Sequence, residues 1–425
     1  MGKIALALIA LSASADGLGA NDGSSSRDAC EADCTGSGDE RRCVFEARLD
    51  IHASSTGYYK FAQCGSTPQP VLAMEQGVEY TFRQKSASNW FHPLGFAYAP
   101  DGAHRGHDEL EPGISKSSDK SCEEGNSCQA PMYFLQGDFL GAVDEDGSAY
   151  KVVYPERNNS GNFGLDVYEP HFLAGRGDWL AAAEEGDSDL GYEVKLTLTD
   201  QAYTNDLFYF CHIHNSMSGR IKQMTTGEAS VLQEKDEPEL GYSYEILSRF
   251  DDRCGTARLG SYAGNEAVCG AGKFTCGDGP TPEAEAFNEC LHALDCAMHE
   301  EMRVKVHPSD PITLFLQQMI PHHENAVNMA KATLKLELLT ANNDPEGEIE
   351  ELLWSIINNQ NMQIYKMTAW LANNGRASVA EANCGYDGDC VADTSIALLV
   401  VIGVCLAVTV AAGAGLVRMR ARGGK

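Results

Sequence analysis

The sequence predicts a multidomain β plus α protein: a β-sandwich, then a small helical bundle, then one C-terminal transmembrane helix. Three observations support this fold class. Short runs of β-branched and aromatic residues alternate with Gly and Asp turns in the N-terminal half, which is typical of a sandwich. From Glu283 onward, apolar residues recur at helical spacing. Residues 396–417 form a run of 22 residues without a charge, which is long enough to cross a bilayer.

The two ends of the chain predict a membrane-anchored protein that lies outside the cytosol. Residues 1–15 carry one Lys, a short apolar run and a final Ala-Ser-Ala, which is typical of a signal peptide. The transmembrane helix at 396–417 is followed by a basic tail at 418–425, and basic flanks stay in the cytosol. We therefore expect a single-pass protein of the plasma membrane or an endomembrane, with its N-terminal ectodomain extracellular or lumenal.

Cysteine content and charge agree with that location. Besides Cys211 and Cys405, thirteen cysteines occur in close groups, which predicts disulfides in an oxidising compartment and leaves one thiol over. The chain has 32 basic and 61 acidic side chains, a net charge of −29. Such a surface repels nucleic acid, so no nucleic-acid partner is expected.

Between its ends the chain divides into four parts by composition. Residues 16–41 are rich in Gly, Ser and Asp and are expected to form a flexible leader. Residues 42–230 form the β domain, and within it 101–190 are expected to be a turn-rich insertion. The remaining parts are a Cys-rich connector at 231–280 and a helical domain at 281–383.

One short segment of the β domain has the composition of a metal site. Cys211, His214 and Met217 follow an apolar strand at three-residue steps. A mononuclear copper site of the blue type needs two His and one Cys in a plane, with a weak axial Met. His92 is the expected second histidine, because it ends an apolar run and directly precedes Pro93. Two alternatives remain: Cys211 could form a disulfide, and zinc could bind, although zinc favours more Cys or His ligands.

These segments resemble a known family. "YFCHIHNSMSGRI" resembles the short ligand loop of amicyanin-like cupredoxins, and "NWFHPLGF" looks like the cupredoxin strand that carries the first histidine. The resemblance implies a cupredoxin-like domain with a type 1 copper ion at His92, Cys211, His214 and Met217, and one-electron transfer there. The chain departs from small cupredoxins in the 118 residues between His92 and Cys211.

Three other histidines of the β domain are expected to have ordinary roles. His212 belongs to the one His-x-His pair of the chain, whereas the three-copper cluster of laccase-type oxidases needs several such pairs. Strand alternation turns His212 away from Cys211, so we expect it to be exposed or hydrogen-bonded. His104 and His107 are expected in a turn-rich surface loop.

The helical domain carries a second candidate metal set. Met319, His322, His323 and Met329 recur at three-, four- and seven-residue steps, and a later helix contributes Met367. Thioethers and imidazoles together suit soft cations such as Cu(I). The alternative is that these methionines simply fill gaps in a packed bundle.

This region also resembles a known family. "FLQQMIPHHENAVNMAK" and "NQNMQIYKMTAWL" are similar to domain of unknown function family 305, a ferritin-like helical bundle, with Gln363 in place of the usual Glu. Some members are associated with copper binding outside the cytosol, and the resemblance implies the same for this chain. Ferritin-type diiron chemistry is not expected, since the Glu-x-x-His pairs that it requires are absent from the sequence.

Together these observations predict a membrane-anchored copper protein that binds, stores or relays copper, with one-electron transfer at the β domain. Its expected partners are copper ions, the membrane, and a redox protein or copper transporter. The alternative is a copper-dependent oxidoreductase acting on a metal ion or small molecule, which would need an open second site. A third interpretation is a disulfide-stapled interaction protein with degenerate sites.

Overall fold

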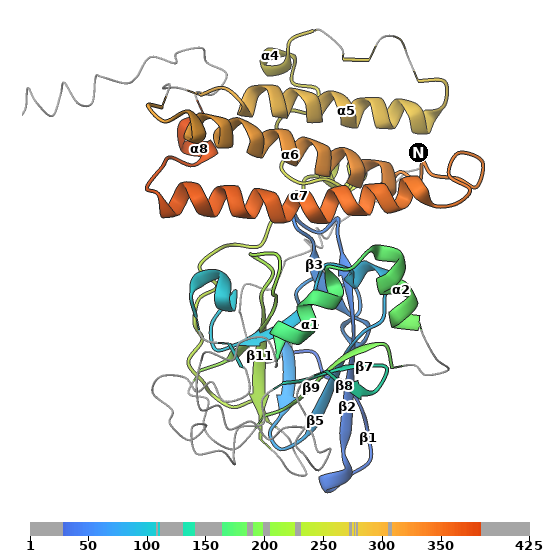
Figure 1. The fold of residues 1–425 in the computed structure, drawn as a ribbon, viewed down its shortest axis with the longest axis vertical. Helices are drawn as coiled ribbons and strands as arrows, with labels where there is room; N and C mark the ends of the chain where they lie inside the picture. Colours follow the sequence, from blue (N-terminus) through green and yellow to red (C-terminus); the bar gives the residue numbers. More distant parts are fainter. Residues whose placement is uncertain are drawn as a thin grey trace, which may run out of the picture.

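The predicted order of a β part followed by a helical part is confirmed (Figure 1). The structure is a computed structural model that describes residues 29–107, 109–110, 131–140, 164–184, 190–198, 205–225, 231–271, 274–275, 277, 279–304 and 308–383. The expected signal peptide, transmembrane helix and basic tail lie outside the described residues. Across the described ranges, no helix combines the length and the apolar character that a membrane span requires.

The β domain is built from two sheets. Its strands are β1 (Asp33–Thr35), β2 (Arg42–Asp50), β3 (Tyr58–Phe61), β4 (Leu72–Glu75), β5 (Glu79–Gln84), β6 (Leu94–Ala97), β7 (Met132–Leu135), β8 (Asp138–Phe139), β9 (Tyr192–Thr197), β10 (Leu207–Cys211) and β11 (Gly219–Met224). One sheet has the order β1-β2-β5-β9-β7-β8, with β3 paired to β2, and the other has the order β4-β11-β10-β6. The pairs β2/β5 and β4/β11 are parallel, and the other pairs are antiparallel.

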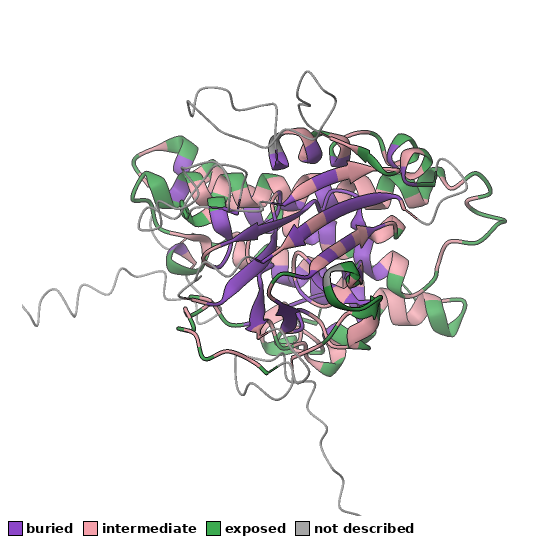
Figure 2. Ribbon diagram, turned by 90° about the horizontal axis from the view of Figure 1, so that it is seen from below, coloured by how far each residue is buried: buried purple, intermediate pink, exposed green. Residues whose placement is uncertain are grey.

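Aromatic side chains join the two sheets into one core. Phe61 of β3 meets Tyr209 of β10 with ring centroids 5.2 Å apart, and Phe82 of β5 meets Phe96 of β6 at 4.8 Å. On β5, alternate residues are buried, as expected for a strand with one face on a core. Strand β10 is buried along its whole length. Figure 2 shows these buried strands crossing the middle of the molecule.

The expected insertion contains two helices that cover the first sheet. They are α1 (Leu165–Phe172) and α2 (Arg176–Glu184). Trp179 of α2 is fully buried and stacks on Tyr192 of β9, with centroids 5.2 Å apart. The described part of this insertion is therefore more ordered than its turn-rich sequence suggests.

The helical domain contains three long helices: α5 (Pro282–Glu301), α6 (Pro311–Lys335) and α7 (Glu348–Asn373). A short α8 (Val379–Ala382) follows them. Thr281 and Asp310 cap α5 and α6 through their side chains, and a proline starts each helix. Helix α6 lies between α5 and α7, and α7 faces the sheets (Figure 1).

Four disulfides are present among the described residues, which confirms the prediction from clustered cysteines. Cys30–Cys64 and Cys34–Cys43 attach the last part of the expected leader, including β1, to the β domain. Cys254–Cys290 and Cys269–Cys296 attach the connector to α5. The connector itself contains the short helices α3 (Arg249–Cys254) and α4 (Glu266–Cys269).

The helical domain and the β domain share one hydrophobic core. Val327 of α6 and Ile357 of α7 belong to the same buried cluster as the facing strands. Lys331 of α6 is also fully buried, and its Nζ donates to the carbonyl oxygens of Ser54 and Ser55, each at 2.8 Å. Burial lowers the pKa of Lys331 to about 8. The two domains are thus docked through both apolar and polar contacts.

Candidate metal centre

Strand pairing brings together the candidate ligands of the β domain. Cys211 is the last residue of β10 and pairs with Leu94 of β6, two residues after His92. His214 and Met217 lie in the loop between β10 and β11. The register of β6 against β10 therefore places His92 beside Cys211, although 119 positions separate them.

Three donor atoms converge on one point. Cys211 Sγ lies 3.6 Å from His92 Nδ1 and 3.7 Å from His214 Nδ1, and the two Nδ1 atoms are 3.2 Å apart. A trigonal ion with bonds of about 2.0 Å to nitrogen and about 2.3 Å to sulfur separates its nitrogens by about 3.5 Å and nitrogen from sulfur by about 3.7 Å. The triangle of donors fits such an ion. Within the described parts of the chain, this is the group of His, Cys, Asp or Glu side chains that could hold a metal.

The three side chains are closed off from solvent. Cys211 is fully buried, and His92 and His214 are each 1% exposed. Burial raises the pKa of the Cys211 thiol to about 12 and lowers the pKa of His214 to about 4. Burial also lowers the pKa of His92 well below its usual value. Both imidazoles are therefore neutral at pH 7, as ligands must be, while the thiol has a proton to release on binding a metal.

Cys211 does not form a disulfide. It is the free cysteine among the cysteines that the structure describes. That finding removes the first alternative to metal ligation, because no other described thiol is available to pair with it.

Met217 belongs to the same buried core as Cys211, and its side chain is fully buried. Its backbone N–H donates to Asp101 Oδ1 at 3.3 Å, which fixes the loop after His214. Ser216, immediately before it, has a φ of 58°, and Phe91, immediately before His92, has a φ of 67°. Left-handed backbone at non-glycine residues costs of order 1–3 kcal/mol each and is common at functional sites. Both strained residues adjoin candidate ligands.

Several polar side chains that the sequence did not single out hold the ligands in place. The carbonyl oxygen of His92 accepts hydrogen bonds from Tyr59 Oη at 2.9 Å and Gln84 Nε2 at 2.6 Å. His104 Nε2 donates to the Cys211 carbonyl oxygen at 3.0 Å. His104 lies in the short helix Gly102–Arg105, where Ala103 and Arg105 are exposed, so the expected surface position is kept while the His104 side chain turns inward against β10.

A helical-domain residue contacts both imidazoles. Asn358 of α7 is fully buried. Its Oδ1 lies 3.2 Å from His92 Nε2, and its backbone oxygen lies 3.3 Å from His214 Nε2. Nothing in the sequence around Asn358 singles it out, because its burial depends on how α7 docks against the β domain.

His212 points away from Cys211, as strand alternation predicts. Its Nδ1 contacts Glu169, and its Nε2 lies 3.4 Å from Glu109 Oε1. Burial disfavours the charged imidazolium, but the two carboxylates outweigh burial and raise the pKa of His212 to about 10. It is hydrogen-bonded, in agreement with the sequence-based interpretation.

The second candidate set, in the helical domain, is more dispersed than its spacing suggests. His323 faces α7, with Nε2 3.0 Å from Gln363 Oε1, and its Nδ1 lies 2.9 Å from the Met319 carbonyl oxygen. His322 is exposed, and Met329 is 38% exposed. Met319 and Met367 are half-buried. The two adjacent imidazoles therefore point to different surroundings, and ligation by this set stays a prediction.

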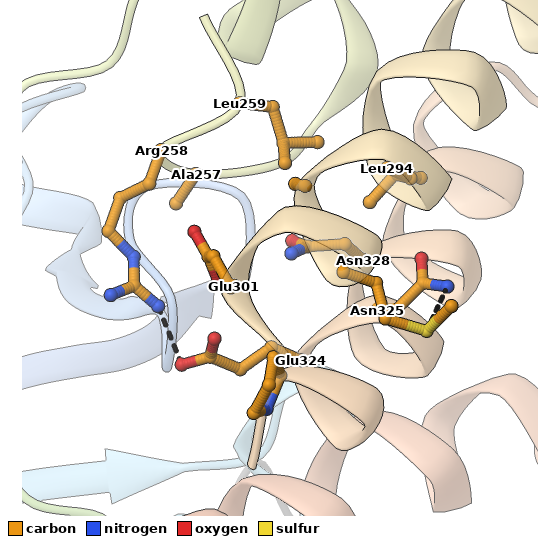
Figure 3. Close-up of a pocket in the computed structure, with 11 residues that line it drawn as sticks. Ala257, Arg258, Leu259, Leu294, Glu301, Glu324, Asn325 and Asn328 are labelled. Carbon is orange, nitrogen blue, oxygen red and sulfur yellow. Dashed lines mark hydrogen bonds and ion pairs between the residues drawn. The ribbon is translucent and has the colours of Figure 1, made fainter. Parts of the chain in front are cut away.

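A small cavity between the connector, α5 and α6 does not have the character of a ligand site (Figure 3). Its volume is about 20 Å³, which is room for one water molecule. Arg258 and Glu324 close it with an ion pair of 2.7 Å. Burial, and next the nearby charge of Glu324, raise the pKa of Glu301, which also lines the cavity. The cavity is therefore too small for a ligand larger than water, and the Arg258–Glu324 ion pair lies at its edge.

Comparison with known proteins identifies the helical part. A family described as a domain of unknown function (DUF305) matches residues 292–371 and 313–394, which include α6, α7 and the second half of α5. The β part matches no cupredoxin family and no structural neighbour. None of the curated proteins matches the chain, and neither does any solved structure. The established similarity is thus that of the helical domain to DUF305.

Proposed function

We propose that this protein binds copper outside the cytosol and stores or relays it, with one-electron transfer at a cupredoxin-like type 1 site in the β domain. One observation carries the proposal: His92 Nδ1, His214 Nδ1 and Cys211 Sγ converge at trigonal distances in a buried site. Met217 is buried in the same core and is the proposed axial ligand.

The donor set favours copper over other metals. A thiolate, two imidazoles and a thioether are soft or borderline ligands, whereas Mg²⁺ and Ca²⁺ prefer oxygen. Zinc sites are mostly tetrahedral and rarely include a thioether. Copper bound to such a set supplies one-electron redox chemistry.

Closure of the site supports a role in binding or electron transfer and argues against the alternative, an oxidoreductase that acts on a metal ion or small molecule. A substrate would need an open position beside the ligands, but His92 and His214 are almost fully buried. The four disulfides fit a compartment outside the cytosol. The membrane anchor at 396–417 and a redox or copper-transporting partner are part of the proposal.

The proposal is tested by adding Cu(II) to the purified, metal-free chain. We expect one ion per chain, an intense visible absorption from thiolate-to-copper charge transfer, and release of the Cys211 proton. Because the thiol is protonated below about pH 12 in the metal-free protein, affinity should rise as pH rises across the neutral range. Zn(II) should bind more weakly and give no colour. A colourless complex, with affinity for Cu(II) no higher than for Zn(II), would contradict the proposal.

For the helical domain we predict unequal roles of its two adjacent histidines. His323 faces Gln363 of α7, whereas His322 is exposed, so His323→Ala should lower Cu(I) binding more than His322→Ala. The measurement is competition between the chain and a colorimetric Cu(I) chelator under reducing conditions, in a background where Cys211 is Ser. Equal affinity in both variants and the parent would show that neither histidine binds Cu(I).

A further inference from the structure

We infer that the helical domain completes the metal centre, with Asn358 as a positioning residue for both imidazoles and α7 as the cover of the site. This inference rests on the proposed function of the β domain. It deepens that function by assigning the DUF305-like helices a role in holding copper and controlling its exchange.

The contacts of the two histidines indicate which nitrogen of each ring carries the proton. A neutral imidazole that offers Nδ1 to a metal carries its proton on Nε2, and the partner of Nε2 decides whether that tautomer is stable. Both Nδ1 atoms face Cys211, and both Nε2 atoms face Asn358. Its side-chain oxygen accepts from His92 and its backbone oxygen accepts from His214. One residue therefore selects the ligating tautomer of both rings.

Asn358 is itself held in place by a hydrogen bond. Its Nδ2 donates to the carbonyl oxygen of Trp90 at 3.4 Å, which directs Oδ1 toward His92. One turn further along α7, Asn361 Nδ2 donates to the carbonyl oxygen of Ser55 at 3.4 Å. The ring of Tyr365 lies 4.9 Å from that of His104, which hydrogen-bonds Cys211. About two turns of α7, residues 358–365, thus contact the candidate metal centre or the residues around it.

The position of α7 controls the access of copper to the ligands. The ligands are buried, and α7 contacts the Nε2 side of both rings. Copper can then enter or leave when α7 separates from the β domain. Copper binding and docking of the helical domain are thermodynamically coupled. If docking raises the affinity for copper by some factor, a bound ion raises the docking equilibrium constant by the same factor.

The test compares two neighbouring asparagines. Asn358→Leu keeps the number and branching of the side-chain heavy atoms but replaces the acceptor for His92 with a methyl group. Asn359→Leu is the matched control, because the bonds of the Asn359 side chain within the described part of the chain go to Ser355 of the same helix. We expect Asn358→Leu to lower Cu(II) affinity about 10- to 100-fold and to shift the visible spectrum, as is typical when an outer partner of a ligand is lost. Asn359→Leu should match the wild type.

A second variant tests the cover separately. Asn361→Ala removes a hydrogen bond that docks α7 on the carbonyl oxygen of Ser55, one turn away from the contacts of Asn358 with the two histidines. It should speed copper transfer to an external chelator while the spectrum stays unchanged. Circular dichroism of each variant checks that its fold is kept.

A measurement on the metal-free chain makes the inference independent of copper loading. Nitrogen NMR of labelled histidines should show Nε2–H on both His92 and His214 in the wild type, and a mixed tautomer of His92 in Asn358→Leu. If the wild type binds no copper, the proposed function fails, and the tautomers still decide the role of Asn358. If copper binds but Asn358→Leu behaves as Asn359→Leu does in affinity and tautomer, the inference is overturned.

Discussion

Changing Cys211 to Ser is expected to abolish the visible absorption of the copper-loaded protein. A serine hydroxyl stays protonated and offers no soft thiolate, so charge transfer to the metal is lost. Loss of a residue that hydrogen-bonds a ligand lowers metal affinity by about 10- to 100-fold. Loss of the ligand Cys211 itself should lower the affinity for Cu(II) further. The metal-free fold should survive, because a buried hydroxyl at this position finds Tyr59 and both imidazoles as hydrogen-bond partners.

The matched variant is Met217→Leu, which changes the proposed axial ligand and conserves volume. Such swaps in a core cost less than about 1.5 kcal/mol. The absorption should persist and the reduction potential should rise, since the axial ligand tunes the metal more than it holds it. A Cys211→Ser protein that keeps the absorption would show that the colour arises elsewhere, and an unchanged potential in Met217→Leu would remove Met217 from the ligand set.

The second large effect is expected at Asp206, which precedes strand β10. Its carboxylate is fully buried and accepts from Arg220 Nη1 at 3.1 Å and Lys222 Nζ at 2.7 Å. Burial raises the pKa of this carboxyl although both cations oppose the shift. Asp206→Asn leaves two nearly buried cations without that countercharge, and loss of one member of a buried ion pair costs about 3–5 kcal/mol.

Urea unfolding of the metal-free chain measures this change. Asp252→Asn is the control, because the Asp252 side chain is 77% exposed and its ion pair with Lys335 spans 3.7 Å. Exposed pairs contribute little, so the control should change the free energy of unfolding by less than about 0.5 kcal/mol. Equal stability of the two variants would show that Glu237, the second partner of Lys222, compensates for the lost carboxylate.

The candidate ligands of the β domain could be found in the sequence because local spacing encodes most of them. Cys211 ends β10, and His214 and Met217 follow within the next six residues. The expected strand before His92 is not found, because residues 87–89 form a short 3₁₀ helix and the neighbouring strand β6 begins after His92, at Leu94. Helix limits were equally local: Asp310 before Pro311 marks the start of α6, and Asn374 and Gly375 follow the end of α7. The helical-domain set shows where spacing is insufficient. His322 and His323 are adjacent in sequence, but only packing decides that His323 faces α7.

The sequence alone therefore supplied the donor set of the candidate site, because residue type and spacing are properties of short segments. The tertiary structure alone decided what surrounds it. Asn358 lies 266 positions from His92, and Lys331 lies 277 positions from Ser54. No local pattern reports such contacts, since they depend on how two separately built domains dock. Disulfide pairing followed the same rule: the clusters of cysteines were visible in the chain, whereas the partner of each depended on the distance between folded elements.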